Sequence, residues 1–192
     1  MKCFRSLAEW LYYTYKESVS VVKYRIMLLS LPKEERVVLI AIDRAFKRPE
    51  CKKENGHVVE MTLRGCGRAA LKARYYVNTD GPDCTFIPDN IGNLKKLRRL
   101  TVRHVSEKMS FLPESIGDLE NLERLEVNHA QLKFLPESIG KLKKLEELIL
   151  LGNKLESLPE SLRNLKSLKS VLIYDNNITD FPDGIDKNII KT

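Results

Sequence analysis

Arginine and histidine side chains at corresponding places in successive segments are the main candidates for chemistry in this sequence. The four arginines at predicted strand positions are Arg64, Arg99, Arg103 and Arg124. A guanidinium fork pairs with carboxylates and phosphates, so these residues predict binding of an acidic group. His104 and His129 also fall at corresponding places, but two imidazoles are too few ligands for zinc. We therefore expect both histidines to be surface residues of the same binding face.

Residues of the catalytic types do not combine into a recognisable site. Serine, histidine and aspartate, or cysteine and histidine, have no positions that would pair a nucleophile with its base. The stretch Gly65–Gly67 is too short for a phosphate-binding loop. We predict a protein that is not an enzyme and that holds no cofactor or metal. An enzymatic alternative would depend on the segment 67–86, where only Asp83 and Cys84 are candidates.

The cysteines are scattered along the chain. None of them belongs to a CxxC motif or to a zinc-binding spacing: Cys3, Cys51, Cys66 and Cys84. We expect reduced thiols in a reducing compartment, which favours a cytoplasmic location. The alternative is a single disulfide that joins Cys66 to either Cys51 or Cys84.

A sequence repeat organises the chain around these residues. The segments IPDNIGNLKKLRRLTV, LPESIGDLENLERLEV, LPESIGKLKKLEELIL and LPESLRNLKSLKSVLI begin at Ile87, Leu112, Leu135 and Leu158. A truncated copy, FPDGID, begins at Phe181. From the second copy onward the starts are 23 residues apart, a period typical of a stacked-repeat solenoid. The spacing LxxLxL in these copies, and its counterpart in the upstream stretch HVVEMTL, predicts five short strands.

These residues resemble the leucine-rich repeat family. The family pattern LxxLxLxxNxL is clearest in LEELILLGNKL at 145–155 and LKSVLIYDNNI at 168–178. The motif LPESIGxL is similar to the 23-residue class of Ras-suppressor-type and prokaryotic intracellular proteins. The resemblance covers residues 57–187 and implies a right-handed α/β solenoid, with five parallel strands on a concave face and short helical turns on a convex face. It also implies a scaffold that binds other proteins, either in the cytoplasm or after export by a bacterium into a host cell.

Asparagine and proline positions within the repeat carry further structural expectations. Asn153 and Asn176 follow predicted strands, where a side-chain amide can bond neighbouring backbone groups. Other residues replace asparagine in the earlier copies, so we expect less regular curvature before Leu135; these counterparts are Cys66, Val105 and Ala130. Prolines at 88, 113, 136, 159 and 182 fix φ ahead of predicted short helical turns.

The outward positions of the predicted strands change character along the chain. Side chains alternate between the two faces of a strand, so residues between the inward leucines face the concave surface. The first three strands place arginines and polar residues there. The last two place four apolar residues there: Ile149, Leu151, Leu172 and Tyr174. Neighbouring strands lie about 4.8 Å apart, so these side chains predict one exposed apolar patch beside the arginines.

This arrangement predicts a protein–protein interaction module. Its ligand would place an apolar anchor on the patch and acidic groups near the arginines. Self-association is one alternative explanation of the patch, and cover by the C-terminal residues, including Ile189 and Ile190, is another. RNA or another polyanion is the alternative ligand for the arginines. That reading is weaker because Tyr174 is the only aromatic side chain expected on the same face.

The sequence upstream of the repeats predicts helices that cover the first one. We assign residues 1–56 to a helical cap and 57–192 to the repeat domain, with an irregular insertion at 67–86 and a truncated last repeat at 181–192. Apolar periodicity predicts one helix over 6–29 and a second from Pro32 to about Lys47. The second helix is expected to bury Val37, Val38, Ile40, Ala41, Ala45 and Phe46. An amphipathic membrane or partner helix at the N-terminus is the alternative.

Composition and charge describe an ordered protein with a basic surface. Apolar residues make up 43% and charged residues 31%, which argues against global disorder. The net charge is +7, which suits an acidic protein, nucleic acid or an anionic membrane equally. Charges interrupt the first apolar stretch, at Glu9, Lys16 and Glu17, so it fits neither a signal peptide nor a membrane span.

Overall fold

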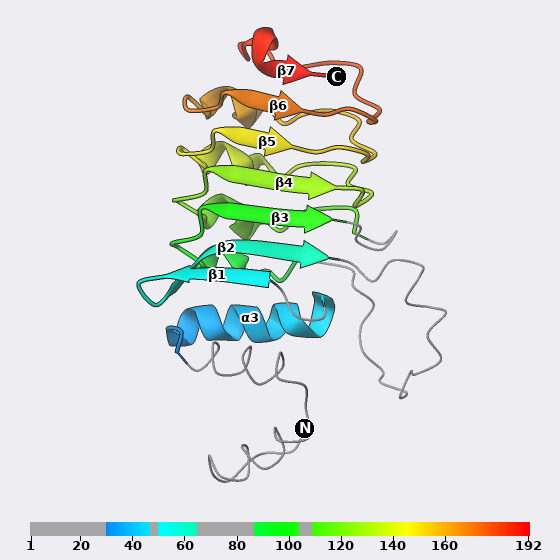
Figure 1. The fold of residues 1–192 in the computed structure, drawn as a ribbon. Helices are drawn as coiled ribbons and strands as arrows, with labels where there is room; N and C mark the ends of the chain where they lie inside the picture. Colours follow the sequence, from blue (N-terminus) through cyan, green and yellow to red (C-terminus); the bar gives the residue numbers. More distant parts are fainter. Residues whose placement is uncertain (1–29, 47–49, 65–86, 104–108) are drawn as a thin grey trace, which may run out of the picture.

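One sheet, stacked strand upon strand, runs through the protein (Figure 1). The computed structural model describes residues 30–46, 50–64, 87–103 and 109–192. The strands are β1 (Glu50–Glu54), β2 (His57–Arg64), β3 (Arg99–Arg103), β4 (Arg124–Asn128), β5 (Glu147–Ile149), β6 (Ser170–Leu172) and β7 (Ile190–Lys191). They are hydrogen-bonded in that order. β1 is antiparallel to β2, and every later pair is parallel.

The sheet extends beyond the predicted strands at both ends. Strands β2 to β6 are the five that the repeat spacing predicts, and β1 and β7 were not predicted. β1 joins β2 through Asn55 and Gly56, whose φ angles of 49° and 77° suit a two-residue hairpin turn. The predicted boundary between residues 56 and 57 therefore falls inside a hairpin. The Asn-Gly pair was the signal for it, because this dipeptide favours the left-handed conformations that such a turn needs.

The C-terminal residues continue the sheet. The short 3₁₀ helix η6 (Lys187–Ile189) leads into β7, whose Ile190 and Lys191 pair with Val171 and Leu172 of β6. The alternative in which the tail folds over the predicted apolar patch is therefore wrong. The tail lies beside the patch, at the edge of the sheet, because its backbone groups complete hydrogen bonds that β6 offers.

Short 3₁₀ turns form the layer behind the sheet. They are η2 (Ile91–Asn93), η3 (Glu114–Asp118), η4 (Glu137–Lys141) and η5 (Glu160–Asn164). Pro113, Pro136 and Pro159 directly precede the last three of these turns, with φ between −70° and −68°. This confirms the predicted role of proline at those positions. Pro182 differs, because a hydrogen-bonded turn at 183–184 follows it and η6 begins only at Lys187.

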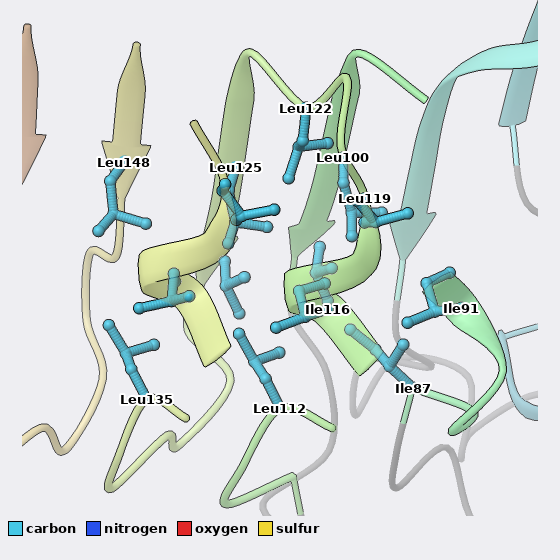
Figure 2. Close-up of a cluster of buried hydrophobic side chains, with 14 of the residues drawn as sticks. Ile87, Ile91, Leu100, Leu112, Ile116, Leu119, Leu122, Leu125, Leu135 and Leu148 are labelled. Carbon is cyan, nitrogen blue, oxygen red and sulfur yellow. The ribbon is translucent and has the colours of Figure 1, made fainter. Parts of the chain in front are cut away.

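Leucine and isoleucine side chains fill the space between the sheet and the turns (Figure 2). The strands contribute Leu100, Leu125 and Leu148, and the turns contribute side chains such as Ile116; all four are fully buried. Each buried leucine or isoleucine contributes roughly 2 kcal/mol relative to an exposed one. Because equivalent leucines stack on one another from repeat to repeat, the core continues along the length of the sheet.

Glycine and serine hold successive turns in close contact. A side-chain carbon on Gly117 would lie 2.3 Å from the backbone oxygen of Ser138, and one on Gly140 would lie 2.5 Å from the Cβ of Ser161. Both distances are far below van der Waals contact, so only glycine fits at these two places. Arg163 occupies the same place in the next turn. The chain after it differs, because residues 183–184 form a hydrogen-bonded turn and a side-chain carbon on Gly184 would meet nothing within 4 Å.

Asparagine side chains connect neighbouring repeats after the strands. The Asn153 side-chain oxygen accepts hydrogen bonds from the amides of Ala130 and Leu132 at 3.1 and 3.2 Å. Its nitrogen donates to the Val127 carbonyl at 2.7 Å. Asn176 repeats the pattern one turn later, accepting from the amide of Leu155 at 3.1 Å. These bonds confirm the predicted role of both asparagines, whereas the counterparts Cys66 and Val105 lie outside the described residues.

Helix α3 (Lys33–Phe46) lies next to the β1–β2 end of the sheet (Figure 1). It begins at Lys33, one residue after the predicted start at Pro32. The buried Glu35 carboxylate accepts from the Val58 amide at 2.8 Å and lies 2.7 Å from the His57 ring nitrogen Nδ1. These contacts fasten the helix to β2.

The buried side of α3 differs from the prediction. Val38 and Leu39 are fully buried, but Val37 and Ile40 are exposed. A helix turns about 100° per residue, so packing Val38 and Leu39 inward directs Val37 and Ile40 outward. The side chains of Ala41, Ala45 and Phe46 and the whole predicted helix at 6–29 lie outside the described residues. Of the helices that the structure does describe, none has the length and apolar character needed to cross a bilayer.

Candidate interaction surface

The open face of the sheet, opposite the turns, carries most of the predicted site residues. Because the strands are in register, the side chains form rows across the sheet. One row is Glu60, Arg99, Arg124, Glu147 and Ser170, and the next is Thr62, Thr101, Glu126, Ile149, Leu172 and Lys191. In the third row Arg103 and Asn128 are followed by Leu151, whose amide donates to the Asn128 side-chain oxygen at 3.0 Å. We call the part on β2 to β4, together with Glu147, the charged half, and Ile149, Leu151, Leu172 and Tyr174 the apolar half.

Glu126 is the centre of the charged half. Its side chain is almost fully buried, and Arg103 places Nε 2.7 Å and Nη2 2.6 Å from the oxygen Oε1. Asn128 donates to the same oxygen at 2.7 Å. Arg124 places Nη2 3.3 Å from the other oxygen. A carboxylate can be buried at this position because three donors replace the water it loses.

Carboxylates also pair with the other arginines of the charged half. Arg124 bonds Glu147 on the next strand, and Arg99 lies 3.8 Å from Glu60. Glu60 in turn accepts a hydrogen bond from Lys52 at 3.1 Å. The hydrogen bond with Glu60, followed by that with Glu54, raises the pKa of the Lys52 ammonium, because both carboxylates favour its charged form. The charged half is therefore a network in which acidic and basic side chains alternate.

This network of ion pairs reduces the capacity of the predicted arginines to bind an acidic ligand. Arg99, Arg103 and Arg124 do lie together on the open face, as predicted, but each is within ion-pair distance of a glutamate. The surface is therefore not a free basic patch. The signal for this was present in the sequence, because the glutamates occupy the same outward positions of neighbouring repeats as the arginines. Arg64 ends β2 opposite Arg103 in the strand register, and its side chain lies outside the described residues.

A polar hollow lies at the edge of the charged half. It has a volume of about 320 Å³ and opens between the first row and the residues just before the strands. Its lining consists of Glu60, Met61, Thr62, Arg99, Thr101, Glu123, Arg124, Glu146 and Glu147. Four of these residues are carboxylates and two are arginines that already have acidic partners. Among the residues that the structure describes, no three histidine, cysteine, aspartate or glutamate side chains are grouped so that they could hold a metal ion.

The apolar half is smaller than the sequence predicts. Ile149 is only 7% exposed, because Glu126 and Leu172 flank it in the same row. The prediction that Ile149 is exposed is therefore wrong. Leu151 and Leu172 are half-buried, and Tyr174 is 46% exposed. The remaining apolar surface centres on the Tyr174 ring, with Lys191 of β7 beside Leu172 in the row.

The structure describes one of the two predicted histidines, His129. His129 is exposed, with a φ of 52°, and its ring lies against Gly152. His104 lies outside the described residues, so its proximity to His129 stays a prediction.

Cys51 is a free thiol in contact with the core, which leaves no Cys51–Cys66 disulfide. Burial raises the pKa of this thiol to about 12, so it remains protonated and unreactive near neutral pH.

Comparisons with known proteins point to one family. A family model described as "Leucine-rich repeat region" matches residues 82–187, more than half of the chain. No curated protein matches the chain. A solved leucine-rich repeat protein of Leptospira interrogans is 28% identical, over 50% of this chain and 30% of its own, with a TM-score of 0.40. This chain therefore spans less than a third of that protein's length.

A second solved structure resembles the fold over a larger share of both chains. The leucine-rich repeat ectodomain of the receptor kinase SOBIR1 from Arabidopsis thaliana is 20% identical, over 78% of this chain and 83% of its own, with a TM-score of 0.55. At that identity the similarity concerns the fold alone.

Proposed function

Because the chain belongs to the leucine-rich repeat proteins, we propose that it is a non-catalytic module that binds a partner protein on the open face of its sheet. The fold alone does not define a function, so the proposal depends on the chemistry of this face. The single observation that carries it is the partly exposed Tyr174 ring, with the half-buried Leu151 and Leu172 around it, at the border of the charged half. Tyrosine at the edge of a partly desolvated cluster is a frequent interface anchor.

The charged half sets the second requirement on the partner. The Arg103 and Arg124 guanidiniums already pair closely with Glu126 and Glu147, whereas Arg99 lies 3.8 Å from Glu60, at the limit of an ion pair. A partner carboxylate would therefore meet Arg99 with the least competition. We propose a partner that places an apolar side chain against Tyr174 and an acidic group near Arg99. Such complementarity affects mainly the specificity and the rate of association.

Two finer assignments accompany this proposal. The hydrogen bonds that link equivalent positions join residues 23 apart, such as Ala130 to Asn153, which supports the 23-residue class. Helix α3 is fastened to β2 by Glu35, which supports a role in covering the first repeat. Nucleic-acid binding through the arginines stays a prediction, and their pairing with glutamates gives it little support.

The experiment compares the wild type with a Leu151→Ala and Tyr174→Ala double variant as affinity baits. A partner found with the wild type should bind the double variant more weakly by about 2–4 kcal/mol, as expected for loss of an interface anchor. Isothermal titration calorimetry with the purified partner gives the dissociation constants. Tyr174→Ala alone is a second variant that leaves the half-buried Leu151 in place.

A matched control removes an exposed apolar side chain from another surface. Val37→Ala is suitable, because Val37 is 51% exposed and belongs to α3, at the β1–β2 end of the sheet and away from β6 (Figure 1). It should leave the affinity unchanged. Circular dichroism shows whether each variant is folded. Unchanged affinity of a folded double variant would exclude the open face as the binding site.

A further inference from the structure

Two exposed phenylalanines lie outside the surface used by the proposed function. Phe111 is 61% exposed and Phe134 is 53% exposed. They fall 23 residues apart, each directly before the first buried leucine of a repeat. The segments that carry them are stacked on one another, because the Lys133 amide donates to the Ser110 carbonyl at 3.0 Å. The two rings therefore belong to one surface, one repeat apart.

Packing within the chain does not account for these rings. The next two repeats carry Ser157 and Asp180 at the same place, and both are exposed. The fold therefore does not need an aromatic residue there. Exposed aromatic side chains that lie together are typical of surfaces that another molecule covers.

A row of carboxylates runs beside the phenylalanines. Three residues after each ring position, the chain carries an exposed acidic residue: Asp89, Glu114, Glu137, Glu160 and Asp183. Three residues span at most about 10 Å, so these carboxylates are close to the rings. Glu114 has no hydrogen-bond or ion-pair partner among the described residues, and Glu160 pairs with Arg163 at 3.2 Å. Lys133 is exposed next to Phe134, but acidic residues outnumber basic ones along this row, although the chain as a whole has a net charge of +7.

We infer that Phe111, Phe134 and the adjacent carboxylates form a second interaction surface, for a protein segment that carries lysine or arginine beside apolar side chains. The apolar groups of such a segment cover the two rings. Its cations pair with Glu114 and Glu137 and contact the ring faces. This chemistry differs from that of the open face, where the proposed partner brings an acidic group.

The test measures binding of a short fluorescent peptide of alternating lysine and leucine by fluorescence anisotropy. Saturable binding to the wild type should weaken about tenfold in a Phe111→Ser and Phe134→Ser double variant. Serine is the matched replacement, since the next repeat carries it naturally at residue 157. A Glu114→Gln and Glu137→Gln double variant should bind several-fold more weakly, and added salt should weaken wild-type binding. Glutamine keeps the acceptor that Glu137 offers to the Ser161 amide at 3.1 Å.

Control measurements distinguish binding at this surface from non-specific binding of the peptide. Val37→Ser changes an exposed apolar residue on α3 and should bind the peptide as the wild type does. A peptide with glutamate in place of lysine should not bind. The inference is overturned if the lysine peptide does not saturate the wild type, if the folded phenylalanine double variant binds it equally well, or if the glutamate peptide binds as tightly. It is also overturned if sedimentation shows a dimer that the double variant loses, because the occupant would then be a second copy of the chain.

Discussion

The turn side and the open side of the same repeats differ in how much sequence variation they allow. On the turn side, three successive copies read PESIG, PESIG and PESLR, and a glycine of one turn touches a serine of the next wherever both occur. On the open side, the corresponding positions carry Arg124, Glu147 and Ser170, or Glu126, Ile149 and Leu172. Close backbone contact restricts the first set, whereas neighbouring side chains alone restrict the second. The open side is therefore freer to vary from repeat to repeat.

The largest effect is expected on the turn side. Gly117→Ala should lower the free energy of unfolding by about 3 kcal/mol, because the added carbon would overlap the Ser138 backbone. Urea unfolding followed by circular dichroism measures it. Arg163→Ala is the control at the equivalent, exposed position of a later turn, and it should change stability by less than about 0.5 kcal/mol. Equal effects of the two substitutions would show that the glycine–serine contact does not restrict the turns.

Replacement of Asn153, which lies between the turn side and the open side, should lower the free energy of unfolding slightly less than Gly117→Ala. Asn153→Ala leaves two buried amides without their acceptor and one carbonyl without its donor. We expect a loss of about 2–3 kcal/mol, the penalty for unpaired buried polar groups. Denaturant unfolding measures the loss. Asn177→Ala, at an exposed residue of the next repeat, should change stability by less than about 0.5 kcal/mol, and a comparable loss there would contradict this account.

A smaller effect is expected at the centre of the charged half. Glu126→Gln leaves Arg103 and Arg124 facing a neutral amide, but both guanidiniums are partly exposed and water can solvate them. We expect a loss of about 1–2 kcal/mol in thermal or chemical unfolding. A change in stability below about 0.5 kcal/mol would show that Glu126 could vary as freely as its exposed neighbours.

The smallest effect on stability is expected at the proposed anchor. Tyr174→Ala should change the free energy of unfolding by less than about 0.5 kcal/mol, because nearly half of the side chain is exposed. Denaturant unfolding tests this. A loss as large as that of Asn153→Ala would mean that Tyr174 serves the fold more than it serves binding.

The sequence allowed prediction of the features that recur in every repeat. The inward leucines and the prolines before the turns recur from repeat to repeat, because each repeat packs against a copy of itself. The two asparagines were recognisable from the family pattern in two of the repeats. β1 and β7 were missed because each lies at an end of the sheet and carries no repeat motif. At the site, the rows of side chains were predictable. The burial of Ile149 and Glu126 was not, because it depends on the size and charge of neighbours on adjacent strands.

The glycine–serine contact has a consequence for changes in chain length. Removing residues 112–134 would bring Gly92 against Ser138, which restores the same kind of contact that Gly92 now makes with Ser115. A deletion or duplication of one whole unit is therefore compatible with the stack at that point. Insertion of a unit directly after the one that contains Arg163 is not compatible with the stack, because it would bring a serine against the arginine side chain. Recombination within the gene could thus lengthen or shorten this protein among its first repeats, but not directly after the unit that contains Arg163.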